Sequence, residues 1–305
     1  MSRQYILLPH IAVHNANAMS STYTVGFPAM TAWLGAFHRL ERELRRTDDC
    51  PALRITGVAV ACEHFHLQQY QKNKFAPINL AMTANPLKKS KKTGAYGRPP
   101  FIAEARCDMK VSFILRTEGI DAEQADDLKT RLLSLLARQK LAGGDIVSLP
   151  DKKQIQMKHL EGSAEERKFM RHLMPGFVLV ERKDLFEALE GDDLDKLLTA
   201  VSLHADPVFD ETTGKIEKWM YRKNLAQGWV VPIAVGYRDL SGDKALRVAN
   251  QRDMQTEHHF VEPLVTLGEF KMPYRFERIE EILWGYHYDQ SRGLYECVND
   301  ISKES

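Results

Sequence analysis

The sequence predicts a mixed α+β fold, and three patterns in its first 150 residues support that prediction. An apolar run near the start precedes a long segment of helical periodicity. A later segment alternates apolar and polar residues as a strand does, and a leucine stripe with helical spacing follows it. The chain has 305 residues, of which 44% are hydrophobic and 27% charged, as in an ordinary globular protein. Its net charge of +1 does not by itself indicate a nucleic-acid partner.

The first predicted strand covers residues 5–13, and the first predicted helix covers residues 29–46. Pro28 suits the start of this helix because the first turn does not need its missing N–H group. Between strand and helix lies a loop of Asn, Ser, Thr and Gly, which could offer backbone N–H groups and a helix N-terminus to a phosphate. The apolar residues of the helix recur at three- and four-residue steps and so share one face: Met30, Trp33, Leu34, Phe37, Leu40 and Leu44.

Two further strands are predicted at residues 53–67 and 105–116. The first has a buried centre of small apolar residues. In the second, odd-numbered positions from Cys107 to Leu115 are apolar and even-numbered positions are polar, with Ile114 as the exception. We therefore expect one face of this strand to lie in the core and the other face to be polar.

The second helix is predicted to begin at Asp121, a favourable N-cap with Gln124 three residues later. We expect it to end at Gly143-Gly144, because glycine is the common residue at a helix C-terminus. A short strand follows at residues 145–149. The helix carries an apolar stripe of Ala125, Leu128, Leu132, Leu135 and Leu136.

The resulting order, β-α-β-β-α-β, predicts a ferredoxin-like core of the kind found in RNA-recognition motifs (RRM-like). The usual arrangement makes the first strand central. Pro9 lies inside that strand and cannot donate a hydrogen bond to a neighbouring strand. We therefore expect a bulge or a bend at Pro9.

Residues 1–150 are thus predicted to form an RNA-binding domain, and residues 151–305 an additional C-terminal α+β region packed on it. No linker-like segment separates the two. The second region is expected to contain a strand at 177–181, an acidic helical segment at 184–203, a loop at 204–227, strands within 228–237 and 259–270, and a helix at 274–287.

The most biased segment is an insertion between the second and third strands, at residues 71–100. From His64 to Ala103 the chain has no Asp or Glu, whereas its average of 41 in 305 would give about five. Acid-free basic stretches are typical of segments that contact phosphate backbones. We expect a long basic hairpin, or thumb, that clamps a nucleic acid; a solvated hairpin tip is the alternative. Its cations include Lys88, Lys89, Lys91, Lys92 and Arg98.

The cysteines and histidines do not complete a metal site. The four cysteines are scattered, which argues against structural zinc and fits a reducing compartment. His64 and His66 would share one strand face but lack further ligands. We expect no metal and no cofactor. One alternative stays open: His10, His14 or His38 could serve a metal-independent endoribonuclease as general acid or base.

Aromatic residues do not predict base stacking on the sheet. The polar faces of the predicted strands lack the paired aromatics of RNA-recognition motifs, so loops and the basic hairpin are expected to bind instead. The tryptophans Trp33, Trp219, Trp229 and Trp284 are expected in the core.

The apolar run at the start is about eight residues, too short for a membrane span. We expect a cytoplasmic protein without a membrane partner.

Several separate motifs occur in order along most of the chain. The first is Asn15-Ala16-Asn17-Ala18, followed by Gly26-Phe27-Pro28 and by Trp33-Leu34-Gly35-Ala36-Phe37-His38. Later motifs are Leu141-Ala142-Gly143-Gly144, Leu173-Met174-Pro175-Gly176-Phe177, Gly228-Trp229 through Gly236-Tyr237, and Leu283-Trp284 to Gly293-Leu294-Tyr295. Together they resemble the 5′-handle-binding tail subunit of the type I-F (Csy-type) CRISPR RNA-guided surveillance complex, in the repeat-associated (RAMP) superfamily.

The resemblance implies a non-catalytic subunit that forms a heterodimer with the large subunit and caps the 5′ handle of the CRISPR RNA. It also implies contact with the backbone subunit and a role in assembling the antiviral interference complex. Target DNA would be read by base pairing with the guide, so this subunit would meet it only indirectly. The implied RNA-binding residues are Asn15, Asn17, Ser20, Ser21, Thr22, Gly26, Lys88, Lys89, Lys91, Lys92, Arg98, Gly143 and Gly144.

Overall fold

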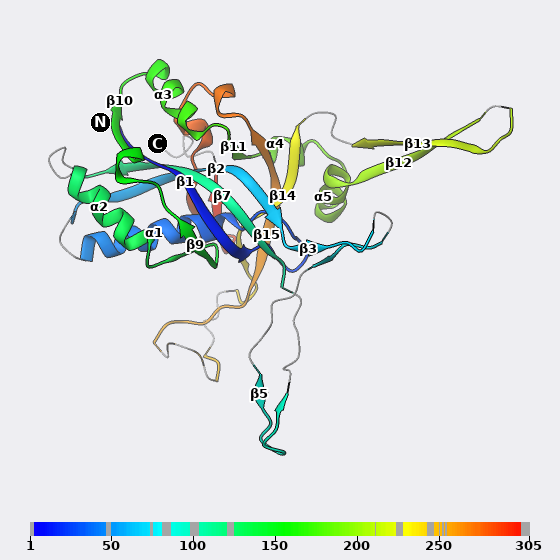
Figure 1. Cartoon of the computed structure of the whole chain (residues 1–305), viewed down its shortest axis with the longest axis horizontal. Helices are drawn as coiled ribbons and strands as arrows, with labels where there is room; N and C mark the ends of the chain where they lie inside the picture. Colours follow the sequence, from blue (N-terminus) through cyan, green and yellow to red (C-terminus); the bar gives the residue numbers. More distant parts are fainter. Residues whose placement is uncertain are drawn as a thin grey trace.

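A computed structural model of the chain describes residues 3–46, 50–73, 76–80, 87–97, 104–120, 125–210, 212–223, 228–242, 247–249, 251, 253 and 255–299. The body is built on one large antiparallel sheet with helices on both faces (Figure 1). The predicted α+β class is therefore confirmed.

Eleven strands form this sheet in the described part of the chain. Their order is β16-β17-β14-β15-β11-β2-β7-β1-β9-β8, and β10 pairs with β1 beside β9. The strands are β1 (Arg3–Asn17), β2 (Arg54–Leu67), β7 (Arg106–Glu118), β8 (Lys140–Leu141), β9 (Gly144–Ser148), β10 (Gln156–Leu160), β11 (Phe177–Glu181), β14 (Trp229–Asp239), β15 (Val261–Lys271), β16 (Gly285–Asp289) and β17 (Leu294–Val298).

The first 150 residues contribute the adjacent strands β2-β7-β1-β9, all antiparallel to their neighbours. Helix α1 (Met30–Arg46) follows β1, and α2 (Ala125–Leu136) connects β7 to β8. Both helices cover the same face, because the whole predicted stripe of α1 and Leu128, Leu132 and Leu136 of α2 belong to one buried cluster. The predicted start of the second helix, residues 121–124, lies outside the described residues.

The opposite face of the sheet is also covered. Helix α3 (Ser163–Met170) and the short 3₁₀ turns η3 (Arg171–Leu173), η4 (Pro273–Arg275) and η5 (Ile279–Ile282) bury a second apolar cluster there. The expectation of a polar face on β7 is therefore wrong at its centre. Ser112 and Ile114 are fully buried on that face, since residues of the C-terminal half pack over it.

The expected bulge at Pro9 is confirmed. The register between β1 and β7 shifts between Leu8 and Ile11, and His10 adopts a left-handed backbone conformation with φ 58°. The His10 N–H group donates to Ser112 Oγ at 2.9 Å, so the donor freed by the bulge is satisfied. Strand β1 continues past its predicted end at residue 13 to Asn17, with a second register shift between Val13 and Ala16.

The predicted end of the second helix is wrong. Helix α2 stops at Leu136, and Gly143 lies in the two-residue turn of the β8–β9 hairpin. Ala142 and Gly143 both have positive φ, 47° and 77°, as a tight hairpin turn of this hand requires. Because glycine serves both helix ends and hairpin turns, composition alone does not distinguish them.

The basic insertion forms two short hairpins in its described parts, rather than one long hairpin. Strands β3 (Gln69–Tyr70) and β4 (Asn79–Leu80) pair first, and β5 (Lys88–Lys89) and β6 (Tyr96–Gly97) pair farther from the body (Figure 1). Residues 74–75, 81–86 and 98–100 of the predicted thumb, including Arg98, lie outside the described residues.

Several predictions for residues 151–305 are wrong. The predicted loop at 204–227 contains a hairpin, β12 (Leu203–Phe209) and β13 (Ile216–Lys223), which projects from the body (Figure 1). The acidic segment divides into α4 (Lys183–Glu187) and α5 (Asp193–Val201), and η2 (Lys152–Gln154) precedes β10. The predicted helix at 274–287 is replaced by η4, η5 and β16, and the strands expected within 228–237 form one bulged strand, β14.

Candidate nucleic-acid interface

The polar loop after β1 meets the β8–β9 turn, so the structure brings two predicted binding segments together. The Asn17 N–H group donates to the Ala142 carbonyl at 2.8 Å. A Cβ atom on Gly144 would lie 2.7 Å from the His14 carbonyl oxygen and 2.8 Å from Ala16 Cα, so only glycine fits there. The glycine turn is therefore fixed directly against the end of β1.

The loop itself is held closed by its own polar groups. Met19 and Val25 form an isolated β-bridge, and the Asn17 side chain both accepts from and donates to the Met19 backbone. The hydroxyl of Thr24 pairs with those of Ser20, at 3.0 Å, and Ser21, at 2.6 Å. Ser21 is buried, Thr22 is exposed, and Gly26 donates its N–H to the Ala18 carbonyl. Asn15 has a left-handed φ of 57°.

A groove of about 560 Å³ runs beside this loop along α1. Asn17, Ser20 and Gly143 line one part of it, and three tyrosines of the sheet line another. These tyrosines are Tyr237 of β14, Tyr286 of β16 and Tyr295 of β17. We call this cavity the tyrosine groove. It unites three of the predicted binding residues with aromatic side chains that sequence reasoning missed.

The three tyrosines offer flat, partly exposed rings, each about 40% accessible. The rings of Tyr286 and Tyr295 lie 5.4 Å apart. Burial raises the pKa of both phenols above the ordinary value of 10.0, so both hydroxyls stay protonated at neutral pH. A protonated phenol can stack against a base and also donate a hydrogen bond.

The predicted lysines lie on the projecting β5–β6 hairpin, well below the body in Figure 1. Lys88, Lys89, Lys91 and Lys92 are all exposed. The Lys89 ammonium lies 5.9 Å from the centre of the Tyr96 ring, which is itself exposed. The structure does not bring these lysines into the tyrosine groove, so the hairpin is a separate candidate site.

Two of the three candidate histidines, His10 and His14, have acidic partners. His10 Nδ1 lies 2.5 Å from Glu63 Oε1, which also accepts from the Ser112 hydroxyl at 2.8 Å. Lys110 Nζ lies 3.2 Å from the other oxygen of this nearly buried carboxylate. Together these groups supply the Glu63 carboxylate with hydrogen-bond donors and positive charge next to the β1 bulge. Ser112 is fully buried, so its hydroxyl is not placed to attack a substrate.

His14 forms a second pair, with Asp108, at 2.6 Å, and this histidine is exposed. Burial alone would raise the pKa of Asp108, but hydrogen bonds from the Asn15 N–H group and the Gln68 amide, together with His14, lower it below 3.8. An exposed histidine oriented by a carboxylate can act as a general base. His38 lines the tyrosine groove and packs edge-on to Tyr286.

Two expectations about aromatic residues are corrected. Trp33 and Trp284 are fully buried as predicted, but Trp219 and Trp229 are about half exposed. The sheet also carries partly exposed tyrosines on β14, β16 and β17, outside the strands of the first 150 residues to which the expectation referred. The alternation in Tyr286-His287-Tyr288 was the available signal, but it lay in a segment read as a helix.

Two further findings concern the part of the chain that the structure describes. It holds no group of three or more His, Cys, Asp or Glu side chains placed to bind a metal ion. None of its helices combines the length and apolar character needed to cross a bilayer.

Comparison with known proteins gives the family. The family described as CRISPR-associated protein Csy2 matches residues 6–297. The chain is also 31% identical, over 319 residues, to the CRISPR-associated protein Csy2 of Pseudomonas aeruginosa (strain UCBPP-PA14). That alignment covers 95% of this chain and 93% of the Pseudomonas protein. The chain therefore belongs to the Csy2 family of CRISPR-associated proteins, which confirms the resemblance to a type I-F (Csy-type) subunit.

Proposed function

We propose that the chain is a non-catalytic, RNA-binding subunit of a cytoplasmic type I-F surveillance complex. With the large subunit it caps the 5′ handle of the CRISPR RNA, and next to the backbone subunit it helps to assemble the antiviral complex. The guide RNA, not this chain, reads the target DNA. Membership of the Csy2 family and the tyrosine groove support this proposal.

We also propose that residues 1–150 form a ferredoxin-like, RRM-like domain and residues 151–305 a region packed on it. The antiparallel order β2-β7-β1-β9, with both connecting helices on one face, supports the first part. The pairing of β11 with β2 supports the second. In this arrangement the RNA site draws on both regions, because the groove combines the β1 loop with strands of the C-terminal half.

The tyrosine groove is the observation that carries the proposal. Single-stranded RNA is bound through unstacked bases that lie on aromatic rings and through backbone N–H and hydroxyl groups that contact phosphate and sugar. The groove supplies both, with Tyr237, Tyr286 and Tyr295 on one part and Asn17, Ser20 and Gly143 on another. The lysines of the β5–β6 hairpin add phosphate contacts at a distance from it.

The groove is tested by changing one tyrosine at a time in the reconstituted complex. Each of Tyr237→Ala, Tyr286→Ala and Tyr295→Ala is expected to weaken retention of guide RNA about 5- to 150-fold, because stacking on a base contributes roughly 1–3 kcal/mol. The corresponding Tyr→Phe variants keep the ring and should lose little. Tyr274→Ala removes a somewhat more exposed tyrosine from η4, outside the groove, and should have no effect. Unchanged RNA retention in all three groove variants would exclude the groove as the binding site.

The basic hairpin is tested by replacing Lys88, Lys89, Lys91 and Lys92 with Glu and measuring RNA affinity across salt concentrations. Each lost phosphate contact should reduce the slope of log affinity against log salt by about 0.7, so four contacts give a change of up to about 3. The matched control replaces Lys153, Lys158, Lys168 and Lys183, four exposed lysines outside the basic insertion. Equal slopes for the two quadruple variants would contradict the role of the hairpin.

A metal-independent endoribonuclease is the second candidate function, and the exposed His14–Asp108 pair favours it. Purified protein incubated with repeat RNA in chelator decides between the two. Site-specific cuts that disappear in His14→Ala, His10→Ala or His38→Ala would establish the nuclease. Intact RNA, together with stable binding, supports the non-catalytic role.

A further inference from the structure

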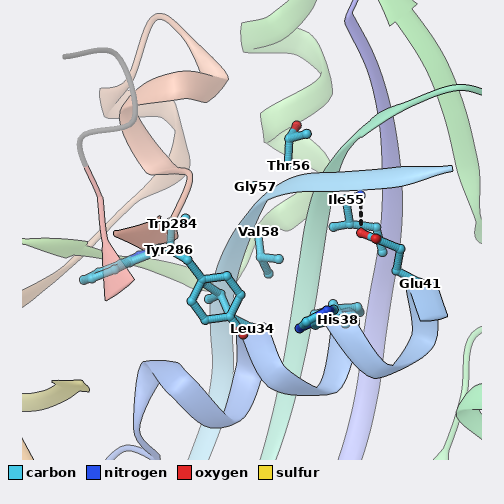
Figure 2. A pocket seen from close by; sticks show the side chains of 11 residues that line it. Leu34, His38, Glu41, Ile55, Thr56, Gly57, Val58, Trp284 and Tyr286 are labelled. Carbon is cyan, nitrogen blue, oxygen red and sulfur yellow. Dashed lines mark hydrogen bonds between the residues drawn. The ribbon is translucent and has the colours of Figure 1, made fainter. Parts of the chain in front are cut away.

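A smaller pocket lies between α1 and β2 and borders the tyrosine groove. The two cavities share His38 and Tyr286 in their walls. Figure 2 shows Tyr286 and Trp284 toward one end of this α1–β2 pocket and Glu41 at the other, with His38 between them on the helix. A strand of RNA bound in the groove would therefore pass the mouth of this pocket.

The size and walls of the α1–β2 pocket suit one flat ring system. Its volume is about 180 Å³, below the roughly 300–1,000 Å³ of pockets that hold drug-sized ligands. Leu34, Phe37, Val58 and Trp284 give it an apolar floor. The partly exposed Tyr286 ring at its mouth can stack on an entering base.

Glu41 gives the pocket a directional polar group. Its Oε2 accepts the Ile55 N–H group at 2.8 Å, as the dashed line in Figure 2 marks, and this fixes the carboxylate. Its Oε1 lies 3.7 Å from both Arg45 Nη1 and Arg54 Nη1. At that distance the two cations balance the charge without filling the hydrogen-bonding positions of Oε1.

The mouth of the pocket is basic. Arg42 is exposed and follows His38 by one helical turn, so it lies on the same side of α1. Arg45 and Arg54 flank Glu41. These cations can hold the phosphates of a nucleotide whose base enters the pocket.

We propose that the α1–β2 pocket receives one unpaired base of the bound RNA and that Glu41 selects guanine there. The inference rests on the proposed RNA-binding function and adds a base preference to it. An ionised carboxylate only accepts hydrogen bonds. Guanine presents N–H donors at two adjacent positions of its Watson–Crick edge, whereas adenine and cytosine present one amino group beside an acceptor that a carboxylate repels.

A cationic side chain of a protein partner is the competing occupant. It is less favoured because Arg45 and Arg54 already balance the charge of Glu41, so a third cation would gain little. The pocket and the tyrosine groove also share His38 and Tyr286 in their walls, which points to the same ligand in both cavities.

The test uses the assembled complex and a guide-RNA pool in which each unpaired handle position is randomised in turn. RNA that stays bound is sequenced. The wild-type complex is expected to enrich guanine about tenfold at one position, within the range that a paired base-edge contact gives. Glu41→Gln keeps an acceptor for Ile55 but offers the base an amide, and it should reduce that enrichment to less than about twofold. Glu41→Asp keeps the charge but withdraws the carboxylate, and it should do the same.

The control is Glu43→Gln, which makes the same chemical change on α1 outside the residues that line the pocket. It should keep the guanine preference. RNA that binds without any guanine preference, or a preference that survives both Glu41 variants, would overturn the inference and leave the proposed function intact. Loss of protein assembly in Glu41→Gln without RNA present would identify a protein occupant instead. Failure of the wild-type complex to retain any RNA would overturn the proposed function itself.

Discussion

Gly144 shows how one residue shapes the candidate site. At this position the β8–β9 turn touches the backbone of β1, with no space for a side chain. We expect Gly144→Ala to lower the free energy of unfolding by about 1–3 kcal/mol, the usual cost of overpacking. Urea denaturation measures this loss. RNA retention should also fall, because the β1 loop and Gly143 line the same groove.

Gly26→Ala is the control, and it lies in the loop between β1 and α1 rather than at the β8–β9 turn. A Cβ atom there meets nothing within 4 Å, and Gly26 is not among the glycines with positive φ. This variant should be neutral or slightly more stable, since alanine restricts the unfolded chain. A destabilisation as large as that of Gly144→Ala would show that the loop is packed differently.

The lowered pKa of Asp108 should make the stability of the fold depend on pH. Hydrogen bonds from Asn15 and Gln68, with the charge of His14, hold its pKa below 3.8 in the folded protein despite partial burial. A lowered pKa contributes stability above the unfolded-state value and loses it as pH falls through the folded-state value. Asp108→Asn should therefore be less stable than wild type at pH 7 and approach it below about pH 3.8. Urea midpoints at the two pH values measure this, and a constant difference would contradict it.

At the scale of elements, the bulge in β1 depends on a buried polar cluster. Glu63 joins His10, Ser112 and Lys110 across β1, β2 and β7. We expect Glu63→Ala to cost about 1–3 kcal/mol, because it leaves the buried Ser112 hydroxyl without its acceptor. Glu63→Gln keeps an acceptor and should cost less. Glu118→Ala, at the exposed end of β7, should change the urea midpoint little.

Elements with one buried face were predictable from the sequence, whereas elements exposed on both sides were not. Helix α1 was found within one residue at its start because its stripe faces the core. The sequence of the β12–β13 hairpin predicts a loop, because Trp219, Met220 and Tyr221 are consecutive and show no alternation; all three are exposed in the structure. The helix predicted at 274–287 is wrong for another reason. Its apolar residues fit helical spacing, but Pro273 and two short 3₁₀ turns place them in the second core.

The candidate site was half predictable. Asn17, Ser20 and Gly143 were identified from loop composition and from the family resemblance, and they do meet in one groove. The tyrosines come from strands more than 90 positions farther along the chain, and only the order of the sheet places them opposite α1. Local patterns carry no information about such distant pairing.

For the whole molecule, the single sheet ties the two halves of the chain together. Strand β11 pairs with β2, and the backbones of Val58 and Trp284 exchange two hydrogen bonds of 2.9 Å. Trp284 lies in the same core as α1 and donates its indole N–H to the Leu179 carbonyl at 2.8 Å. Separating residues 1–150 from the rest would expose one edge of β2 and the apolar face that carries Leu7 and Ile114.

We therefore expect the full chain to unfold in one cooperative transition, although the sequence predicts two regions. Trp33 and Trp284 are buried reporters, one from each half. In Trp284→Phe the fluorescence change reports Trp33, and in Trp33→Phe it reports Trp284. Within each variant the fluorescence and far-ultraviolet circular dichroism midpoints in urea should coincide, as two-state unfolding requires. Because Trp219 and Trp229 are half exposed in the folded state, their emission should change less than that of the buried pair. Two separate transitions, with residues 1–150 alone retaining one of them, would show instead that the halves fold independently and that the groove between them forms only by docking.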